Sequence, residues 1–543
     1  MGAYPKMSVD GRPSIMTTTR QQTLATLVAR ATALAPDAVA LVGLGSQVTW
    51  QAVERHTAAL ASRLLSSGVR PGDRVAVARL KGHESFEAVH AILRAGATVV
   101  PIDPLAPPSI GRAVLADAGV RAVIGDARTV RALDPWSAVA HPLAAVVVTD
   151  QLPGCAVLDW QTVVGDESRE DLPAVDPGDI AYIIYTSGST GRPKGIVHTH
   201  RSAMAYAERA VAEYGLSTTD RLAGMSPLHV DMSTLELYAA PLACATVVIM
   251  SEFHLQFPAS LTSRSAECGV TVWYTVPFVL RGVVEHGALD RRALPTLRAV
   301  LYGGEPYAGA SLRQLMRLLP QVSVVNVYGP AEVNACTHHH ITDPSVVGDH
   351  VPIGKPWDGA DVRVVDERGE AVPPGMSGEL WVSTPTVMDR YWGLDDLTRQ
   401  RLRSRADRPS WYATGDIVVQ DVDGRLWFEG RRDHQVNVRG ARLELEAIER
   451  VLTDAPDVVH AVAASAGSHG DASHIVAAVV LRDGATPDTP KLRRWCADRL
   501  QVVAVPQRIL YLSTMPVMGS GKVDRATVRA LLRDSMVESE VQS

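Results

Sequence analysis

Apolar positions in the N-terminal part of the chain recur with two different periods. Helical spacing runs through 52–67, which Gly68 follows, and through 85–96, whereas 75–78 and 98–102 are short continuous apolar runs. Similar short runs follow at 144–148, 270–274, 299–302 and 322–325. Because helical and extended segments alternate, we expect a parallel sheet covered by helices on both faces.

The pattern changes after about residue 352, where Val, Gly and Asp alternate over short stretches such as 362–366. This change predicts a smaller β-rich subdomain. A further block begins after 430–433, with helices expected at 444–453 and 490–500 and strands at 458–464 and 475–481. The expected fold class is therefore α/β, with a large N-terminal domain of parallel sheets covered by helices, a β-rich subdomain and a small α+β C-terminal domain.

Composition limits the possible functions. A chain of 543 residues exceeds what one hydrophobic core supports, so we expect two or more domains. The expected bounds are a loose tail at 1–19, a core at 20–432 and a lid at 433–543. The net charge of −6 gives no reason to expect nucleic acid or an anionic membrane as a partner. No apolar run approaches the roughly 18–20 residues that span a bilayer, and the polar N-terminus lacks the apolar core of a signal peptide.

Cysteine and histidine are the residue types that most often bind transition metals. The five cysteines are scattered and form no Cys-x-x-Cys pair, which argues against disulfides or a zinc site and favours a reducing cytoplasm. His338, His339 and His340 are consecutive. Because adjacent residues on a strand point to opposite faces, three in a row cannot easily hold one ion. A solvated or structural role is the favoured interpretation.

A β-prone run at 180–185 leads directly into small residues, hydroxyl groups and a lysine. Glycines let backbone N–H groups close around phosphate oxygens, hydroxyls donate further hydrogen bonds, and lysine adds positive charge. The run lacks the Walker pattern, so a kinase-like or GTPase function loses its main support. A flexible linker is the alternative, but linkers rarely follow a buried strand. The predicted triphosphate-binding residues are Thr186, Ser187, Gly188, Ser189, Thr190, Gly191 and Lys194.

This loop resembles the phosphate-binding core of the adenylate-forming superfamily, which includes acyl-CoA synthetases, luciferases and the adenylation domains of non-ribosomal peptide synthetases. Further motifs that resemble the family follow in its order at 326–332, 412–416, 430–440 and 519–525. The resemblance implies ATP and Mg²⁺ as cofactors. Such enzymes join a carboxylate to the α-phosphate of ATP, so they must neutralise charge and align both reactants.

The resemblance also implies roles for individual residues around the nucleotide. Tyr328 would stack on adenine and Asn326 would bind its exocyclic amine. Glu332 would hold Mg²⁺, with Thr190 as a second contact and as part of the catalytic loop.

Three further motifs complete the implied machinery. Asp416 would bind the ribose hydroxyls and Arg431 would contact ribose or phosphate. Asp433 occupies the position of the family's hinge, about which a mobile C-terminal domain would swing. Lys522, between glycines near the C-terminus, would reach the α-phosphate and the substrate carboxylate as the catalytic lysine.

Asp231 indicates which carboxylate is activated. In amino-acid-activating members, an Asp-x-Ser at this point pairs with the α-ammonium group of the substrate, because a carboxylate in an apolar pocket needs a cationic partner. The alternative is that Asp231 is the N-cap of a helix over 232–238. The sequence departs from the peptide-synthetase pattern at His229 and Val230, where an aromatic residue commonly precedes the aspartate. His229 is closer to what CoA ligases show, which leaves the thiol acceptor open.

The family's pocket positions predict a wall that is apolar apart from two tyrosines and a cysteine. A large side chain at Tyr302 would make the cavity short, and no charged wall residue awaits a charged substrate. The expected substrate is a small neutral L-amino acid, alanine before glycine, serine or 2-aminobutyrate, with proline as an alternative. Alternatively, Tyr274 and Tyr302 are strand aromatics that pack in a hydrophobic core. An error of one residue in assigning the pocket positions would be enough to misplace them. The predicted pocket residues are Asp231, Met232, Leu235, Tyr274, Val300, Tyr302, Val327, Ala335, Cys336 and Lys522.

The combined expectation is a stand-alone adenylation enzyme of natural-product (antibiotic) biosynthesis. It would form an aminoacyl-AMP and pass the aminoacyl group to a separate carrier protein, either to its phosphopantetheine thiol or to the amine of a carrier-bound aminoacyl group. One alternative is an acyl-CoA synthetase that uses free CoA, which His229 favours and Asp231 disfavours. The other is a non-catalytic nucleotide-binding paralogue, which the presence of Thr190, Glu332, Asp416 and Lys522 argues against.

Overall fold

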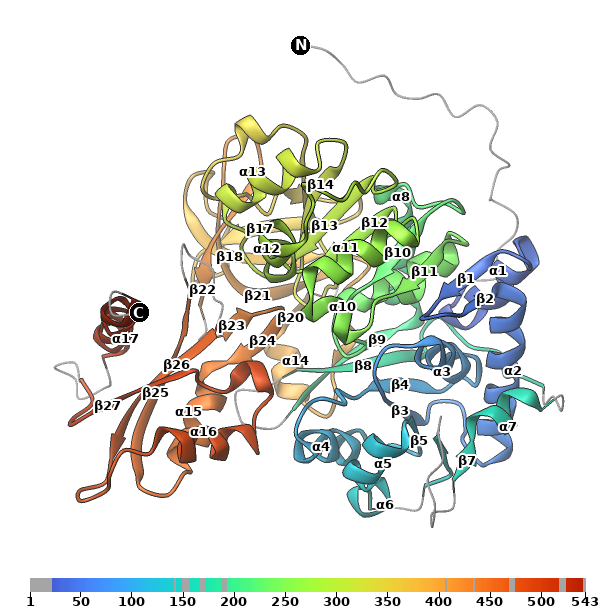
Figure 1. Cartoon of the computed structure of the whole chain (residues 1–543), viewed down its shortest axis with the longest axis horizontal. Coiled ribbons are helices and arrows are strands. Elements are labelled where there is room, and N and C mark those ends of the chain that lie inside the picture. The colour runs from blue at the N-terminus through green and yellow to red at the C-terminus, as the bar shows by residue number, and fades with distance from the viewer. Residues whose placement is uncertain are drawn as a thin grey trace.

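A computed structural model of the chain describes residues 22–140, 143–148, 157–166, 171–186, 193–405, 408–432, 435–467, 474–516 and 524–540. These residues form a large N-terminal part with two main sheets and a third, smaller sheet, followed by a smaller C-terminal part (Figure 1). The predicted N-terminal tail, the loop residues 187–191, Asp433 and Lys522 lie outside the described residues.

The first main sheet has eight strands, and its inner pairs are parallel. In spatial order the strands are β19 (Arg390–Tyr391), β9 (Lys194–Thr199), β8 (Ile180–Thr186), β4 (Thr98–Pro101), β3 (Arg74–Ala78), β5 (Ala122–Gly125), β6 (Ala145–Val148) and β7 (Leu158–Asp159). The helices of this region are η1 (Leu24–Thr26), α1 (Leu27–Leu34), α2 (Trp50–Ser66), α3 (His83–Arg94), α4 (Pro108–Ala118), α5 (Ala127–Leu133), α6 (Pro135–Ala138) and α7 (Trp160–Gly165).

The second main sheet has nine strands and carries most of the candidate site. Its order is β16 (Lys355–Pro356), β15 (Thr337–Ile341), β14 (Ser323–Tyr328), β13 (Ala299–Gly303), β12 (Val272–Thr275), β10 (Arg221–Gly224), β11 (Thr246–Ile249), β1 (Val39–Val42) and β2 (Gln47–Thr49). The helices of this region are α8 (His200–Tyr214), η2 (Asp231–Ser233), the π-helix η3 (Leu235–Ala239), α9 (Ala240–Leu242), α10 (Glu252–Gln256), α11 (Pro258–Glu267), α12 (Pro277–His286), α13 (Gly309–Leu318) and η4 (Pro344–Val346).

The β-rich subdomain and the C-terminal part follow. The subdomain contains β17 (Asp361–Val365), β18 (Ser377–Ser383), β20 (Leu402–Arg405), β21 (Arg408–Gln420), β22 (Leu426–Arg431) and α14 (Asp395–Arg401). The C-terminal part contains the hairpin β23 (Gln435–Val438) and β24 (Ala441–Glu444), the sheet β25 (Val458–Ala466), β26 (His474–Leu481) and β27 (Arg508–Leu512), and the helices α15 (Leu445–Thr453), α16 (Thr489–Ala497), η6 (Val502–Ala504) and α17 (Arg525–Glu540).

The predicted fold class is confirmed, with one refinement. One hydrophobic core joins both main sheets through side chains of α2, α3 and α8, so these helices fill the space between the sheets (Figure 1). The main sheets are mixed rather than purely parallel, because β8 and β9 run antiparallel, as do β14 and β15. Short connections allow this, since antiparallel strands do not need a crossover.

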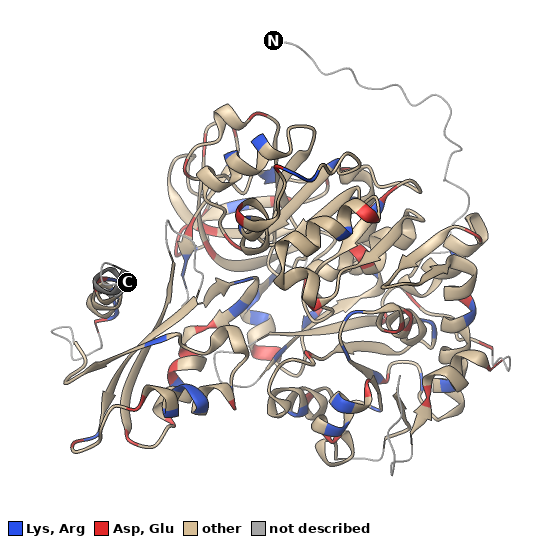
Figure 2. Cartoon of the chain, viewed as in Figure 1, with Lys and Arg blue, Asp and Glu red and all other residues tan. Residues whose placement is uncertain are grey.

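The described elements show neither a segregated charge pattern nor a helix suited to a membrane. Lys and Arg are interspersed with Asp and Glu along the described ribbon (Figure 2). Of the described helices, none combines the length and the apolar character that a membrane crossing requires.

Two predicted pocket residues lie on the wrong face of β13. Val300 and Tyr302 pack into a second core, together with Trp273 and Val324, and the Tyr302 ring lies 5.2 Å from that of Tyr307. Neighbouring residues on a strand point to opposite faces, so their neighbour Leu301 packs instead into the core that α8 covers. The predicted pocket was therefore out of register by one residue on this strand, and Tyr302 does not shorten it.

The environment of the Tyr302 hydroxyl leads to a stability prediction. This oxygen is buried and finds no hydrogen-bond partner among the described residues, whereas the equally buried Tyr391 hydroxyl donates to Glu332 at 2.7 Å. Tyr302→Phe should leave the free energy of unfolding unchanged or raise it by up to about 1 kcal/mol, whereas Tyr391→Phe should lower it by about 1–3 kcal/mol. Urea unfolding of both variants checks this. Equal destabilisation by the two substitutions would contradict it.

Candidate active site

Glu332, in the loop between β14 and β15, is a fully buried carboxylate. Its Oε1 accepts a hydrogen bond from the Tyr391 hydroxyl at 2.7 Å and lies 3.5 Å from Nζ of Lys194, while its Oε2 accepts from Nη1 of Arg442 at 2.7 Å. Burial alone would raise the pKa of Glu332, but Arg442 and Lys194 outweigh it and hold that pKa well below its usual range. The site therefore contains an ionised carboxylate, a ligand type that Mg²⁺ prefers.

Arg442 reaches this carboxylate from the C-terminal part. The β23–β24 hairpin is closed by Arg439 and Gly440, both with positive φ (52° and 80°), as a two-residue hairpin turn requires. The hairpin packs on the N-terminal part, where the Asn437 amide donates to the carbonyl of Gly304. In this arrangement Arg442 occupies one oxygen of Glu332, so a metal ion can take that oxygen only after Arg442 withdraws.

The predicted nucleotide residues Tyr328, Asp416 and Arg431 lie together. The Tyr328 hydroxyl donates to Asp416, and the Arg431 guanidinium pairs with the same carboxylate. Strands β21 and β22 bring this about, because Asp416 and Arg431 are directly paired across them. Asn326, also on β14, donates through its amide to the carbonyl of Pro352 at 2.9 Å.

Two described residues flank the predicted phosphate loop. Thr186 ends β8, and its buried hydroxyl has no hydrogen-bond partner among the residues described. Lys194 begins β9, and its ammonium lies over the Tyr391 ring at 4.8 Å. The two strands therefore present both ends of the loop beside Glu332.

Asp231 opens an irregular segment in which the 3₁₀ helix η2 precedes the π-helix η3. Such π segments are rare and frequently mark functional sites. Thr234 donates to Asn334 at 3.1 Å, and Asn334 donates to the Tyr182 hydroxyl at 3.2 Å, which fixes the segment against the β14–β15 loop. The alternative N-cap role does not hold, because the Asp231 side chain accepts the adjacent N–H of Met232 (3.0 Å) rather than an N–H two or three residues further on, and the segment that follows is a 3₁₀ turn and a π-helix.

Asp231 lies away from the positive side chains that the structure describes around Glu332. The pKa of Asp231 is raised to about 7, chiefly because burial disfavours the charged form; nearby Glu332 also raises it, whereas the Met232 N–H and Arg442 oppose the rise. No lysine, arginine or histidine forms an ion pair with it in the described part of the chain. His229 instead lies 3.7 Å from Asp103. The site therefore offers a carboxylate that a positively charged ligand would stabilise.

A small hollow lies beside Met232, Leu235 and Tyr274. It holds about 10 Å³ of free space, roughly the room that one water needs. The one acid in its lining, Glu236, is paired with Lys81. The lining of the hollow therefore carries no unpaired charge, and the hollow itself has little free space.

The remaining predicted wall residues divide between two cores. Val327 and Ala335 share a core with Leu235 and Leu301, on the face that α8 covers. Cys336 packs with Ile196 and Leu380 in the core under the β-rich subdomain. Cys336 therefore packs in a different core from Val327 and Ala335, and its role in the pocket wall stays a prediction.

Sequence reasoning missed Arg442, Tyr391 and Asn334. Alternation of polar residues on either side of Arg439 and Gly440 is a signal for a hairpin with a polar face that includes Arg442. No comparable local signal marks Tyr391 or Asn334, because their partners are far away in the sequence.

Comparison with known proteins agrees with this geometry. Residues 28–392 match the AMP-binding enzyme family, and residues 447–522 match the AMP-binding enzyme C-terminal domain. An L-proline--[L-prolyl-carrier protein] ligase from Streptomyces coelicolor is 35% identical over 476 residues, which cover 86% of this chain and 88% of that protein. A ligase of the same description from Pseudomonas fluorescens is 32% identical over 492 residues, 90% of this chain and 95% of that protein.

A solved structure is similar over almost the whole length. The amide bond synthetase McbA from Marinactinospora thermotolerans superimposes with a TM-score of 0.84 at 27% identity, over 94% of this chain and 99% of that one. The family match at 28–392 alone spans more than half of the 543 residues. The chain therefore belongs to the AMP-binding enzyme family and is an ATP-dependent, adenylate-forming ligase.

Proposed function

We propose that the chain activates a small neutral L-amino acid as its aminoacyl adenylate, with release of pyrophosphate, and then transfers the aminoacyl group to a carrier protein. The observation that carries this proposal is Asp231, a half-buried carboxylate that forms no ion pair with a positive side chain among the described residues. The α-ammonium group of an amino acid supplies that partner. A carboxylic acid without an amino group does not.

We propose a task for each part of the site in holding this substrate. The ammonium group pairs with Asp231, and the side chain enters the hollow beside Met232, Leu235 and Tyr274. A carboxylate oxygen of the amino acid attacks the α-phosphorus of ATP, and the bond from that phosphorus to pyrophosphate breaks. Lys194 offsets the negative charge that gathers there, and we extend the same role to Thr190 and Lys522 from the resemblance.

Alanine is the first candidate substrate. The hollow has room for about one water-sized group, which suits a methyl side chain. Glu236, the acid in its lining, is already paired with Lys81, so it does not call for a positively charged side chain. Proline is the second candidate, because two relatives that match most of this chain are prolyl-carrier protein ligases. The sequence suggested that Tyr302 would shorten the cavity and exclude larger side chains. Because Tyr302 lies on the other face of β13, it does not exclude the ring of proline.

ATP–pyrophosphate exchange tests the substrate directly. The panel contains alanine, proline, glycine, serine, phenylalanine, lysine and propionate. We expect exchange with alanine or proline and background exchange with propionate, phenylalanine and lysine. Propionate-dependent exchange would contradict the role of Asp231, whereas exchange led by phenylalanine or lysine would contradict only the proposed pocket. Transfer of labelled alanine to a phosphopantetheinylated carrier protein, compared with free CoA, then identifies the acceptor.

The pKa of Asp231 predicts a pH dependence. The ionised form binds the ammonium group and predominates above a pKa of about 7; the amino-acid ammonium stays protonated across this range. The kcat/KM for the amino acid should therefore fall below pH 7, approaching tenfold per pH unit. Exchange rates measured against pH at subsaturating amino acid check this. A profile without an inflection near pH 7 would contradict the assignment.

Asp231→Asn provides the matched variant. It should reduce kcat/KM for the amino acid by some hundreds- to thousands-fold, since it removes one member of a buried charge pair. The inflection near pH 7 should disappear with it. Asp396→Asn, at a side chain that is 98% exposed, is the control and should behave like the wild type.

A further prediction concerns Mg²⁺. We propose that Glu332 and Thr190 hold Mg²⁺ during adenylation, after the C-terminal part has rotated about Asp433 and withdrawn Arg442. Because Arg442 and the ion compete for Glu332, Arg442→Ala should lower the Mg²⁺ concentration for half-maximal exchange several-fold. Arg439→Ala is the control, since Arg439 lies over the Phe278 ring on the same hairpin. An unchanged or increased Mg²⁺ requirement in Arg442→Ala would refute the competition.

We place this activity in the cytoplasm, where ATP and carrier proteins are available. The described cysteines, Cys244, Cys268, Cys336 and Cys496, are all free thiols, as a reducing compartment favours.

A further inference from the structure

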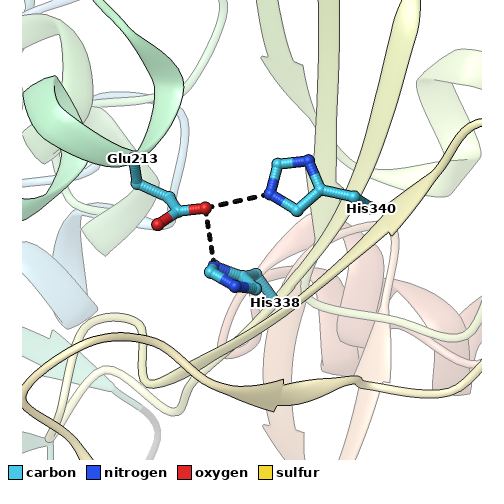
Figure 3. Close-up of side chains that lie close together, drawn as sticks. All are labelled: Glu213, His338 and His340. Carbon is cyan, nitrogen blue, oxygen red and sulfur yellow. Dashed lines mark hydrogen bonds and ion pairs between the residues drawn. The ribbon is translucent and has the colours of Figure 1, made fainter. Parts of the chain in front are cut away.

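Glu213, His338 and His340 converge on one point outside the active site (Figure 3). Both histidines lie on β15 and are two residues apart, so they point to the same face of the strand. Glu213 is near the C-terminal end of α8, which covers that face. Its Oε1 lies 3.2 Å from Nδ1 of His338 and 2.9 Å from Nε2 of His340. We propose that these side chains bind a divalent transition metal ion of the Zn²⁺ type, which ties α8 to β15.

The distances fit a tetrahedral ion. Ligand atoms about 2.0–2.1 Å from a tetrahedral centre are about 3.3 Å from one another. Both measured separations are close to this edge length, and the remaining separation between the two ring nitrogens is within 4.8 Å. The two rings are inclined by 74° with centroids 5.0 Å apart, so they approach the carboxylate from different directions.

Hydrogen bonding alone leaves this cluster incompletely satisfied. His340 and Glu213 form a hydrogen bond. Nδ1 of His338 is buried and lies near the same carboxylate oxygen, yet it has no hydrogen-bond partner in the described part of the chain. An unpaired buried nitrogen is unfavourable, and a metal ion between the three side chains would satisfy it.

The donor set selects the class of ion. Two imidazoles and a carboxylate suit Zn²⁺ and similar transition metals, whereas Mg²⁺ prefers oxygen ligands. The site should therefore bind Mg²⁺, the ion that accompanies ATP, only weakly. The His340 side chain is 42% exposed and those of His338 and Glu213 are 18% and 20% exposed, so solvent can supply a fourth ligand. His339 points to the other face of β15, which explains why the run as a whole did not predict the site.

The position of the site suggests a structural effect. His338 is paired across the sheet with Val327 of β14, which lies beside Gly303 of β13. The same helix, α8, supplies Tyr206 and Ala207 to the core that contains Val327. A bound ion would therefore fix the end of α8 over the strand that carries Asn326 and Tyr328, and we expect it to raise the thermal stability of the enzyme.

Zn²⁺ binding to the full-length enzyme tests the proposal. Enzyme without a histidine tag, treated with chelator and kept in excess Mg²⁺, is titrated with Zn²⁺ against a chromophoric chelator. We expect one Zn²⁺ per chain and a higher melting temperature with Zn²⁺. Glu213→Gln and His340→Gln should each weaken binding at least tenfold and abolish the thermal shift. His339→Gln is the matched control on the opposite face and should bind like the wild type.

The results separate this site from adventitious binding. The absence of stoichiometric Zn²⁺ binding by the wild type would overturn the proposal. The proposal would also be overturned if Glu213→Gln and His340→Gln bound Zn²⁺ as tightly as the wild type. It would be overturned, too, if His339→Gln lost as much affinity as His340→Gln. Co²⁺ provides a second readout, because wild-type enzyme should give the intense visible absorption of a low-coordinate ion and His340→Gln should not. The melting temperatures of the metal-free variants show whether they are folded.

Discussion

A carboxylate buried in a protein interior is costly unless positive charge or donated hydrogen bonds surround it, and the centre of this molecule is organised by that constraint. Glu332 satisfies it with Lys194 of β9, Tyr391 of β19 and Arg442 of β24. One side chain thus joins the first main sheet, the loop after β14 and the C-terminal hairpin. Asp231 does not satisfy it within the described chain, and its pKa is raised to about 7 as a result. The protein itself supplies the partners of Glu332, whereas we propose that a ligand supplies the partner of Asp231.

The two carboxylates are linked through the segment between β14 and β15. This segment carries Glu332, and it also carries Asn334, which adopts a positive φ of 63° and anchors the turn after Asp231 through Thr234. Asparagine is one of the few residues that adopt this conformation readily. Tyr328 at one end of the segment contacts Asp416, and His338 at the other end faces Glu213. The proposed nucleotide, amino-acid and metal sites therefore all depend on one short stretch of chain.

Local patterns predicted the elements well, and long-range contacts explain what was missed. The helix expected at 52–67 is α2 (Trp50–Ser66), and the strand expected at 98–102 is β4 (Thr98–Pro101), because periodicity and a glycine stop are encoded within each segment. The pocket prediction was wrong for Val300 and Tyr302, since a shift of one residue on a strand exchanges its two faces. Arg442 reaches Glu332 across 110 residues of sequence, a contact that no local pattern reveals.

The central claim is that Asp231 recognises an α-ammonium group. Its most direct test is the affinity of a non-hydrolysable alanyl-AMP analogue, measured by calorimetry and compared with the propionyl analogue that lacks only the amino group. The account predicts that the wild type binds the alanyl analogue some hundreds- to thousands-fold more tightly, and that Asp231→Asn loses this preference. Equal affinity of the wild type for both analogues would contradict the account.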